Sequence, residues 1–570
     1  IACASTALQE QLAGQEGDVF TLSRLLGLNV DARMAKDPRQ YMCDIKVDQA
    51  ANSLIAEPNK QISQVLDWAK ATSRGERSEV PQVADRLWKK VAWDETMSCG
   101  VCSARGYCKL VKAREYYRPA GDLIIADHEV LFADLWTREE RLADGKLTLL
   151  PAYAGVVFDE GHKVILPAAM RAGAKIGKED IDSMVYSLEQ IQGARRALTS
   201  SIMAVEFASI NFFKTLYKSV IKSDKDQRLA VQVNAELLKG AQILRQALDA
   251  MQLELQNEQE MHLDSISAAE FQAYDVRIEG AMAALARLGK DKGNQAICWL
   301  DRIDRSFWVV PRDISGLLKE HLFNKNIPVV FSSATLSNGG DFSYFSRALG
   351  LIEPSCSFVG SAFDFEEQVV SYIPNDILFD NKEMWFSTAI AQLVSLLKLS
   401  GGRALILTNS MSEVRKIRKA LVNYQFNFNI LWEDRGERGY IVRRFREDVS
   451  SVLVGSGFWE GIDVPGEALS LLVIWQLPFP ALDPLIEVRR KAAKEQGMNP
   501  QVAVDYPEMG LKLKQGCGRL IRTKNDKGII AIMDQFLGRP WEQYVRDALP
   551  AGAKVATRTE ELNLEKKFFC

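Results

Sequence analysis

The sequence predicts an α/β protein with two parallel-sheet domains, a cysteine-bearing module and a helical insert. Three observations lead to this fold class. Short apolar, β-branched runs end repeatedly in small or acidic residues, as buried parallel strands do. A stretch without proline between Pro167 and Pro311 has apolar residues at helical spacing. Four of the nine cysteines fall within residues 43–108, with three of them clustered: Cys43, then Cys99, Cys102 and Cys108.

The first strand-to-loop junction that carries chemistry is Asp159-Glu160-Gly161-His162, which follows the apolar residues 153–158. Ligands of open α/β sheets gather at the carboxyl ends of the strands. There the first carboxylate can hold Mg²⁺ beside a phosphate, and the second can orient and deprotonate an attacking water. A strand followed by an acidic helix N-cap is the ordinary alternative, because a four-residue match is weak evidence by itself.

Four further junctions follow in order, at residues 331–336, 404–410, 455–463 and 515–522. Their small residues let backbone N–H groups approach a phosphate or a partner loop. In the last junction Arg519 and Arg522 are three residues apart, which predicts two guanidiniums on one helical face, suited to phosphoryl oxygens. An ordinary surface pair would explain these two arginines taken singly. Five junctions in this order favour a nucleotide-hydrolysing site.

The cysteine spacing predicts a metal centre. Cys99-Gly-Val-Cys102 is a tight turn that can put two thiolates on one centre, and Cys108 is close enough to join them. The spacing alone leaves both zinc and an iron–sulfur cluster open, and unrelated reduced thiols are a third interpretation. Disulfides are not expected in a chain of this composition. The four histidines show no zinc-pair spacing, so a packing or hydrogen-bonding role is expected for His128.

These motifs together resemble superfamily 2 DNA helicases of the XPD/DinG type. Residues 159–162 look like motif II of that family, 331–336 like motif III, 457–463 like motif V and 515–522 like motif VI. The first residues, 1–12, look like motif Ia of DinG proteins. The resemblance covers nearly the whole chain. It implies two RecA-like motor domains that hold ATP between them and move 5′→3′ along single-stranded DNA, in DNA repair or replication-conflict resolution.

The resemblance also implies a role for each motif residue. Asp159 would position Mg²⁺, and Glu160 would act as the catalytic base, with His162 in the same motif. Three residues of motif VI would reach the phosphates of ATP: Gln515, Arg519 and Arg522. Four residues of motifs III and V would couple the phosphate state to the nucleic acid: Ser332, Thr335, Gly461 and Asp463.

The same resemblance favours iron–sulfur over zinc for the cysteines. Members of this family carry a [4Fe–4S] cluster between motifs Ia and II, held by one distant cysteine and three clustered ones. Cys43 matches the distant ligand, and the other three match the clustered set: Cys99, Cys102 and Cys108. The implied cofactors are therefore a [4Fe–4S] cluster and Mg²⁺, with ATP as substrate.

The motifs divide the chain into segments. Residues 1–30, 121–165 and 306–345 are expected in the first motor domain, and 346–570 in the second. The Fe–S module would occupy 31–120, and a helical, Arch-like domain would occupy 166–305. Within this insert, steps of three and four residues predict one long helix from its apolar members: Val233, Leu237, Ala241, Leu244, Leu248, Met251 and Leu255. Any helical insert would explain that pattern; its position favours the Arch.

The net charge of −3 gives no general attraction to nucleic acid, so DNA contacts need local basic strips. One candidate strip interleaves basic and aromatic side chains: Lys109, Lys112, Arg114 and Arg118 with Tyr107, Tyr116 and Tyr117. A solvated amphipathic helix explains it equally well. No targeting signal or membrane span is visible. The expected partners are single-stranded and forked or tailed duplex DNA, bound by a cytoplasmic monomer without membrane contact.

One expected motif is absent from the printed sequence. No Gly-x-x-x-x-Gly-Lys-Ser/Thr loop, which cradles phosphates and should precede motif Ia, occurs in these 570 residues. Either the chain is a fragment, or the protein has lost its nucleotide loop. In both cases we expect the chain alone to be close to inactive toward ATP. The alternative function is a non-hydrolysing, cluster-bearing single-strand-binding protein derived from a helicase.

Overall fold

The computed structural model describes residues 1–14, 17–56, 60–97, 99–100, 102–221, 227–261, 266–290, 296–375, 377, 381–436, 438–462, 464 and 466–564. They form two compact units. The first consists of Ile1–Ile221 and Arg228–Ser333, and the second contains Ala334–Cys570. The division falls within motif III, whereas the sequence placed residues 306–345 together in the first domain.

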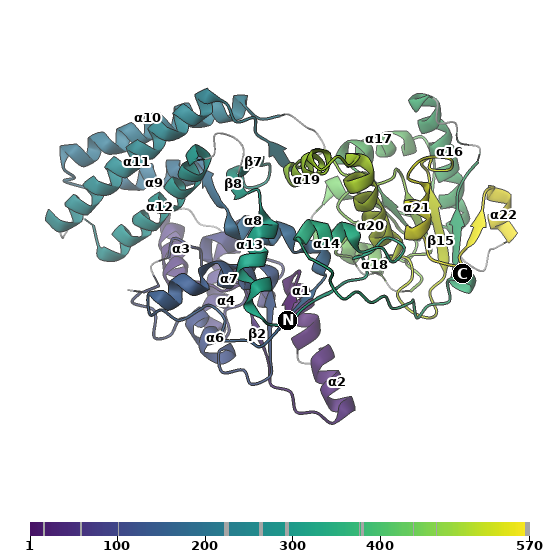
Figure 1. Cartoon of the computed structure of the whole chain (residues 1–570), viewed down its shortest axis with the longest axis horizontal. Coiled ribbons are helices and arrows are strands. Elements are labelled where there is room, and N and C mark those ends of the chain that lie inside the picture. The colour runs from purple at the N-terminus through teal and green to yellow at the C-terminus, as the bar shows by residue number, and fades with distance from the viewer. Residues whose placement is uncertain are drawn as a thin grey trace. The chain divides into compact units, whose positions relative to one another are not determined.

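The first unit is built on a five-stranded, all-parallel sheet in the order β2-β3-β1-β4-β9 (Figure 1). Its strands are β1 (Ala2–Cys3), β2 (Ala32–Ala35), β3 (Leu123–Asp127), β4 (Val156–Asp159) and β9 (Val329–Ser332). Its helices are α1 (Thr6–Ala13), α2 (Asp18–Leu26), α7 (His128–Ala143), α8 (Ile165–Ala172), α13 (Ile314–His321) and the short turns η1 (Pro38–Gln40), η3 (Gly161–Lys163) and η4 (Phe323–Lys325). Parallel neighbours need long crossovers, which is why strands far apart in sequence lie side by side.

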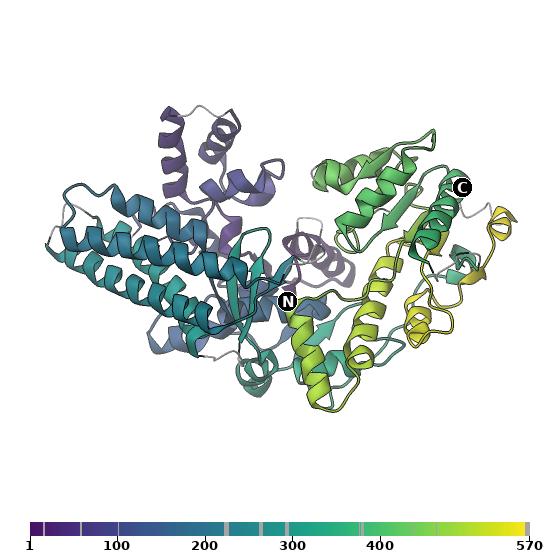
Figure 2. The same ribbon diagram turned by 90° about the horizontal axis from the view of Figure 1, so that it is seen from above.

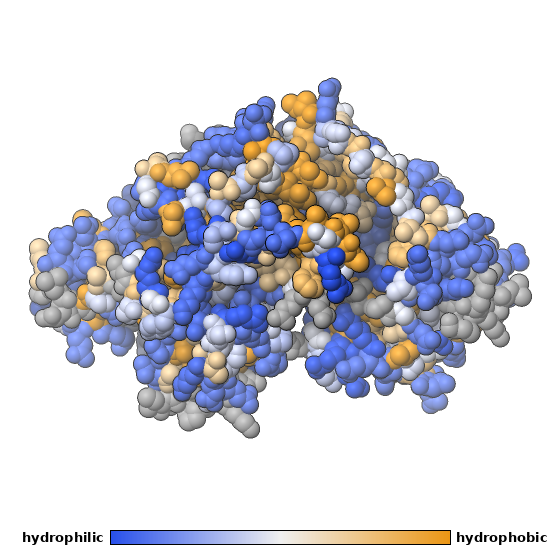
Figure 3. Space-filling view, turned by 90° about the horizontal axis from the view of Figure 1, so that it is seen from below, coloured by the Kyte–Doolittle hydropathy of each residue, from blue (hydrophilic) through white to orange (hydrophobic). Residues whose placement is uncertain are grey.

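Aromatic packing joins the central strands of this sheet. Phe158 of β4 stacks on Phe331 of β9, with ring centroids 4.9 Å apart, and on Phe132 of α7 at 5.7 Å. On the opposite face, Val157 and Val330 are paired in register and remain 37% and 51% exposed. Parallel sheets are usually covered on both faces, so this apolar face is unusual. Figure 3 shows hydrophobic residues gathered among hydrophilic ones on the face of the molecule that it presents.

The cysteine module is a small helical subdomain. Its helices are α3 (Asp44–Ala56), α4 (Lys60–Ala71), η2 (Arg77–Glu79), α5 (Asp85–Val91) and α6 (Lys109–Tyr117). The core contains Val65, Leu66 and Trp88, and the Trp88 indole N–H donates to the carbonyl of Arg39, 2.9 Å away. This core forms within a single crossover between β2 and β3, so the module is an insertion in the first sheet.

Buried ion pairs attach the module to the motor sheet. Lys36 follows β2, and its side chain is 2% exposed. Its ammonium nitrogen lies 2.5 Å from the carboxylates of both Glu10 on α1 and Glu76 in the module. Its neighbour Asp37 accepts hydrogen bonds from Arg39 at 2.8 Å and from Arg171 of α8 at 2.6 Å. Removing one member of such a set would leave a buried charge without compensation, so this loop is a rigid junction.

The insert between motifs II and III combines helices with a sheet, whereas the sequence predicted helices alone. A four-stranded antiparallel sheet runs in the order β5-β8-β7-β6. Its strands are β5 (Ala174–Gly177), β6 (Arg228–Ala230), β7 (Ala296–Asp301) and β8 (Ser306–Pro311). β8 lies beyond the predicted limit at residue 305. These strands are short and pair over long sequence distances, so local periodicity does not reveal them.

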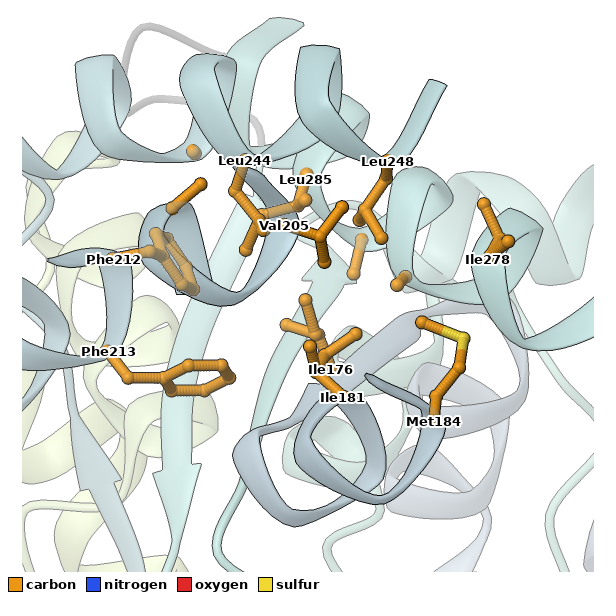
Figure 4. Close-up of a cluster of buried hydrophobic side chains, with 14 of the residues drawn as sticks. Ile176, Ile181, Met184, Val205, Phe212, Phe213, Leu244, Leu248, Ile278 and Leu285 are labelled. Carbon is orange, nitrogen blue, oxygen red and sulfur yellow. The ribbon is translucent and has the colours of Figure 1, made fainter. Parts of the chain in front are cut away.

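Four helices pack beside one another on this sheet: α9 (Lys178–Glu189), α10 (Arg196–Lys218), α11 (Ala235–Met261) and α12 (Ala268–Lys290) (Figure 2). The long helix predicted from apolar spacing is α11. Six of its seven predicted positions are buried in the insert's core: Leu237, Ala241, Leu244, Leu248, Met251 and Leu255. The seventh, Val233, precedes the helix. Figure 4 shows Leu244 and Leu248 facing side chains of α9, α10 and α12 in this core.

The second unit is built on a seven-stranded parallel sheet in the order β12-β13-β11-β14-β15-β10-β16. Its strands are β10 (Val369–Tyr372), β11 (Ala404–Leu407), β12 (Ile430–Trp432), β13 (Val452–Gly455), β14 (Leu471–Ile474), β15 (Gly528–Ile532) and β16 (Lys554–Ala556). Its helices are α14 (Ser343–Leu349), α15 (Phe365–Gln368), α16 (Lys382–Ser400), α17 (Met411–Leu421), η5 (Glu433–Arg435), α18 (Arg438–Glu447), α19 (Pro484–Glu495), the π-helix η6 (Gln501–Asp505), α20 (Tyr506–Cys517), α21 (Glu542–Ala548) and α22 (Thr559–Leu564).

The second sheet is covered on both faces. Along β11, Ala404 and Ile406 join one hydrophobic core, and Leu405 and Leu407 join the other. This alternation is what the two-residue period of a strand requires when helices cover both sides. The predicted α/β class with two parallel sheets is therefore confirmed. Among the described residues, no helix has the length and apolar character needed to cross a membrane.

The buried face of α10 should carry much of the insert's stability. Phe212 is fully buried, whereas Phe207 on the same helix is 71% exposed. We expect Phe212→Ala to lower the free energy of unfolding of the insert by about 3–5 kcal/mol, because it leaves a cavity. The matched control Phe207→Ala should change it by less than about 0.5 kcal/mol. Urea denaturation followed by circular dichroism measures both; equal losses would contradict the described core.

Candidate active site and cysteine module

The carboxylates of motif II lie at the carboxyl end of β4. Asp159 is the last residue of this strand and is paired in register with Ser332, the last residue of β9. Glu160 follows with a left-handed backbone (φ 50°), a conformation that costs energy for a residue with a Cβ and is found mainly at functional sites. Gly161 is next, and a Cβ there would lie 3.0 Å from Phe331. The bend therefore depends on close approach between β4 and β9.

A hydrogen-bond network holds Glu160. The Ser333 hydroxyl donates to Glu160 Oε2 at 2.8 Å, and His162 Nδ1 lies 2.9 Å from Ser333 Oγ and 3.3 Å from Glu160 Oε2. The hydrogen bond from His162, helped by that from Ser333, lowers the pKa of Glu160 to about 2 against the opposing effect of burial. Glu160 is therefore ionised and held in one orientation.

Asp159 has the opposite electrostatic character. Burial, and then the neighbouring charge of Glu160, raise its pKa. Two adjacent carboxylates at a strand end are oxygen donors whose repulsion a divalent cation relieves, so this donor set fits Mg²⁺. Behind them, burial lowers the pKa of His128 to about 4, and its neutral ring donates from Nε2 to the Asp159 carbonyl at 2.9 Å. This matches the hydrogen-bonding role expected for His128.

In the second unit, the structure brings motif III and motif VI together. Gln515 on α20 donates from Nε2 to the Thr335 hydroxyl at 3.2 Å. The sequence selected Ser332 and Thr335 as the functional hydroxyls of motif III, but Ser333 is the one that contacts the motif II glutamate. Three consecutive hydroxyl or small residues gave no local signal of which side chain faces which partner.

The expectation that Arg519 and Arg522 share a helical face is wrong. Helix α20 ends at Cys517, so Arg519 lies in the turn that follows and Arg522 in the irregular chain beyond it. The Arg519 guanidinium donates to the carbonyls of Trp459 (3.2 Å) and Ile462 (2.6 Å) in motif V. Arg519 thus links motif VI to motif V, while the backbone N–H of Arg522 donates to Asp526 at 2.7 Å.

Motif V turns sharply at Gly461, which has a positive φ of 73°. A Cβ at this position would also lie 3.2 Å from the guanidinium of Arg438. Glycine is therefore required here for conformation and for space. Asp463, the other motif V residue selected from the sequence, lies outside the described residues.

The four predicted cysteine ligands are all free thiols. Cys43 is buried just before α3, and Cys108 caps the start of α6. Burial above all, and then the nearby thiols of Cys108 and Cys99, raise the pKa of Cys43 to about 11. The Trp93 indole N–H donates to Cys99 Sγ at 3.1 Å. N–H···S bonds of this kind accompany thiolate ligands of iron–sulfur clusters.

These thiols do not form a finished metal site in the structure. Within the part of the chain that is described, no three His, Cys, Asp or Glu side chains are arranged to hold a metal ion. Four thiols in one module, one of which accepts a hydrogen bond from an indole N–H, are ligands of the kind that hold an iron–sulfur cluster.

The basic strip after the cysteines is only partly exposed. Tyr117 is buried and donates to the Leu149 carbonyl at 3.0 Å, and Arg118 donates to the Thr148 carbonyl at 2.5 Å. Tyr107 and Tyr116 remain 53% and 63% exposed. Tyr117 and Arg118 therefore pack against the protein, whereas Tyr107 and Tyr116 are accessible at the surface.

Comparisons with known proteins agree with this architecture. A family model described as "Helicase C-terminal domain" matches residues 393–552. The "Probable ATP-dependent helicase YpvA" of Bacillus subtilis is 31% identical over 542 residues, which cover 93% of this chain and 82% of that protein. The "ATP-dependent DNA helicase DinG" of Photobacterium profundum is 25% identical over 615 residues, covering 97% of this chain and 88% of that protein.

A solved structure named "XPD_Helicase" has the same fold, with a TM-score of 0.56 at 13% identity, and the match covers 98% of this chain and 91% of that one. The chain therefore belongs to the superfamily 2 helicases of the DinG/XPD type. The family expected from the motifs is confirmed, as are the two RecA-like parallel sheets.

The role of Ser333 can be separated from that of its neighbour. We expect Ser333→Ala to raise the pKa of Glu160 from about 2 toward its ordinary 4.5, because the carboxylate loses a donor. In a longer version of the polypeptide that includes a phosphate-binding loop, the acidic limb of the ATPase pH profile should move to higher pH, and turnover should fall about tenfold. Ser332→Ala is the control and should leave the acidic limb in place. A shift in both variants would contradict the assignment.

Proposed function

We propose that this chain is the motor of an ATP-dependent DNA helicase that moves 5′→3′ along single-stranded DNA. The observation that carries the proposal is the network at the end of β4, where Glu160 is held ionised by Ser333 and His162 beside the Asp159 carboxylate. Membership of the DinG/XPD family supplies the substrate class. Forked or tailed duplex DNA, a cytoplasmic location, a monomeric state and a role in DNA repair or replication conflicts belong to the same proposal.

In the proposed mechanism, each group of this chain has one task. Asp159 would hold Mg²⁺, which supplies charge neutralisation for the phosphates. Glu160, fixed by two donors, would orient the attacking water and accept its proton. The family resemblance assigns Gln515, Arg519 and Arg522 to the phosphates, and Ser332, Thr335, Gly461 and Asp463 to coupling with the nucleic acid. Arg519 already holds two carbonyls of motif V, so movement at a phosphate would reach that loop directly.

A second candidate function is that of a cluster-bearing single-strand-binding protein that does not hydrolyse ATP. The printed residues contain no Gly-x-x-x-x-Gly-Lys-Ser/Thr loop, whose amides and lysine would bind phosphate. DNA-stimulated ATP hydrolysis, measured for the chain alone and for a version with the loop, separates the two functions. Turnover only in the longer version supports the motor; none in either supports the binding protein.

The base assignment can be tested in the loop-containing version. Glu160→Gln should reduce ATP turnover by about 10²- to 10⁴-fold, because the amide cannot accept the proton of the attacking water. Binding of single-stranded DNA should be unchanged, since Glu160 lies at the strand end and not on a basic surface. Glu140→Gln, an exposed substitution on α7, is the matched control. A coupled ATPase assay with oligo(dT) measures turnover; a fully active Glu160→Gln protein would refute the assignment.

We further propose that Cys43, Cys99, Cys102 and Cys108 hold a [4Fe–4S] cluster. Two observations support it: Cys108 and Cys99 are near enough to Cys43 to contribute to its raised pKa, and the Trp93 indole donates to Cys99 Sγ. When bound, the cluster would link the cysteines between α5 and α6 to Cys43 and so stabilise the fold of the module. The ion pairs of Lys36 would then connect this ordered module to α1.

Iron and sulfide analysis tests the cluster proposal. Protein purified without oxygen should contain about four iron and four sulfide per chain. Cys102→Ser should lose most of the iron, whereas Cys356→Ser should keep it, because Cys356 is exposed and lies in the second unit. Zinc in place of iron, or equal iron loss in both variants, would overturn the proposal.

The exposed part of α6 is a proposed contact for single-stranded DNA. Tyr107 and Tyr116 offer accessible ring faces for bases, and the exposed Lys112 offers a cation for phosphates. Tyr116 is additionally positioned by Arg33, whose guanidinium lies 5.1 Å from the ring and donates to the Tyr116 carbonyl at 2.6 Å. A fixed aromatic face loses little entropy when a base stacks on it.

A further inference from the structure

The first turn of motif V encloses a carboxylate. Strand β13 ends at Gly455, the loop continues with Ser456 and Gly457, and Glu433 of η5 points into this turn. Glu433 Oε2 accepts the backbone N–H of Ser456 at 2.6 Å, the N–H of Gly457 at 3.1 Å and the Ser456 hydroxyl at 3.2 Å. Successive backbone N–H groups that converge on one oxygen form an anion-binding nest.

The two glycines make room for this anion. A Cβ on Gly455 would lie 2.8 Å from Glu433 Oε2, and one on Gly457 would lie 2.4 Å from Oε1. Both distances are too short for real contacts, so any larger residue would displace the carboxylate. The small residues that suggested a phosphate-binding turn in the sequence therefore surround an oxygen anion supplied by the protein itself.

Glu433 is held by this nest and not by a cation. Among the described residues, no Lys, Arg or His nitrogen lies within ion-pair distance of its carboxylate. Arg438 braces the other side of the loop, where its guanidinium donates to the carbonyls of Gly457 (3.0 Å) and Glu460 (2.8 Å). An anion held only by N–H and O–H donors can be exchanged for another anion that accepts the same hydrogen bonds.

The surface next to the nest is rich in arginine. Five exposed arginines lie within η5 and α18: Arg435, Arg438, Arg443, Arg444 and Arg446. Tyr440 on the same helix is 53% exposed, and Arg443 lies 5.8 Å from its ring centroid. A row of cations with an aromatic face suits a strand of phosphates and bases better than a single nucleotide.

We propose that Glu433 is an internal anion that competes with a nucleic-acid phosphate for the Ser456–Gly457 nest. The proposal rests on the proposed function only in taking single-stranded DNA as the ligand. Without DNA, the carboxylate fills the nest and keeps the loop ordered. When a strand binds along α18, a phosphoryl oxygen takes the same three donors and Glu433 turns to solvent. The carboxylate thus weakens DNA binding and makes it dependent on displacement of a charged side chain.

The substitution that tests this is Glu433→Gln, which keeps the shape and an acceptor oxygen but removes the charge. Fluorescence anisotropy with labelled oligo(dT), without ATP and at several salt concentrations, should show about fivefold tighter binding, because one like charge near a phosphate is removed. The slope of log affinity against log salt should steepen by about 0.7, as expected for one more phosphate contact. Glu447→Gln on α18 removes one charge away from the nest and should change affinity less than twofold.

The outcomes separate this inference from the function on which it rests. If Glu433→Gln binds no tighter than the wild type, or Glu447→Gln gains as much, Glu433 is only a brace for the loop and the inference is overturned while the helicase proposal stands. If neither protein binds oligo(dT) at low salt, the DNA-binding function fails and the inference with it. If only binding of a fluorescent ATP analogue tightens, the nest serves a nucleotide and the inference is wrong.

Thermal unfolding checks that the variants fold. Should Glu433→Gln prove unfolded, Glu433→Asp makes the same comparison, because the shorter side chain no longer reaches the Ser456 N–H while the charge is kept. Oligo(dT) binding by Glu433→Asp should then be tighter than that of the wild type. No gain in this folded variant would also overturn the inference.

Discussion

The parallel pairing of β4 with β9 is the constraint on which the catalytic end of the first unit depends. Because both strands run in one direction, their last residues, Asp159 and Ser332, meet at the same edge of the sheet. The stacked rings of Phe158 and Phe331 fix this register from inside. Glu160 and Ser333 follow these two residues in the chain. They therefore lie within hydrogen-bond distance of each other. A one-residue slip would turn every one of these side chains to the opposite face.

Two neighbouring carboxylates receive different electrostatic environments from this arrangement. Glu160 gains donors from His162 and Ser333, and its pKa falls; Asp159 gains burial and a like charge, and its pKa rises. Adjacent groups whose pKa values are pushed apart are suited to separate tasks. Glu160 is held in place as an anion, and Asp159 is a carboxylate whose charge a bound cation would stabilise. The strained backbone of Glu160 shows that the fold stabilises this geometry against its local cost.

The same physical device, an anion or cation enclosed by fixed partners, recurs at the junctions of the fold. Lys36 joins α1 to the cysteine module through two carboxylates. Arg519 joins motif VI to motif V through two carbonyls, and Glu433 fills the turn of motif V. Each contact links segments that are distant in sequence, and each is polar and directional. Such contacts therefore fix the places where these distant segments of the chain meet.

The sequence alone determined the two parallel sheets, the strands that precede motifs II, III and V, the long helix α11 and the family, because strand ends, apolar periods and motif order are local properties. Only the tertiary structure decided the rest. The insert's sheet pairs β5 with β8 across more than a hundred residues, a register that no local period encodes. Likewise, the pairing of β9 with β4 brings Ser333, and not Ser332, to Glu160, and the fold directs the Arg519 guanidinium to two carbonyls of motif V. Glu433 has no recognisable motif at all; it acquired a role because the chain folds its carboxylate onto two backbone N–H groups of a distant turn.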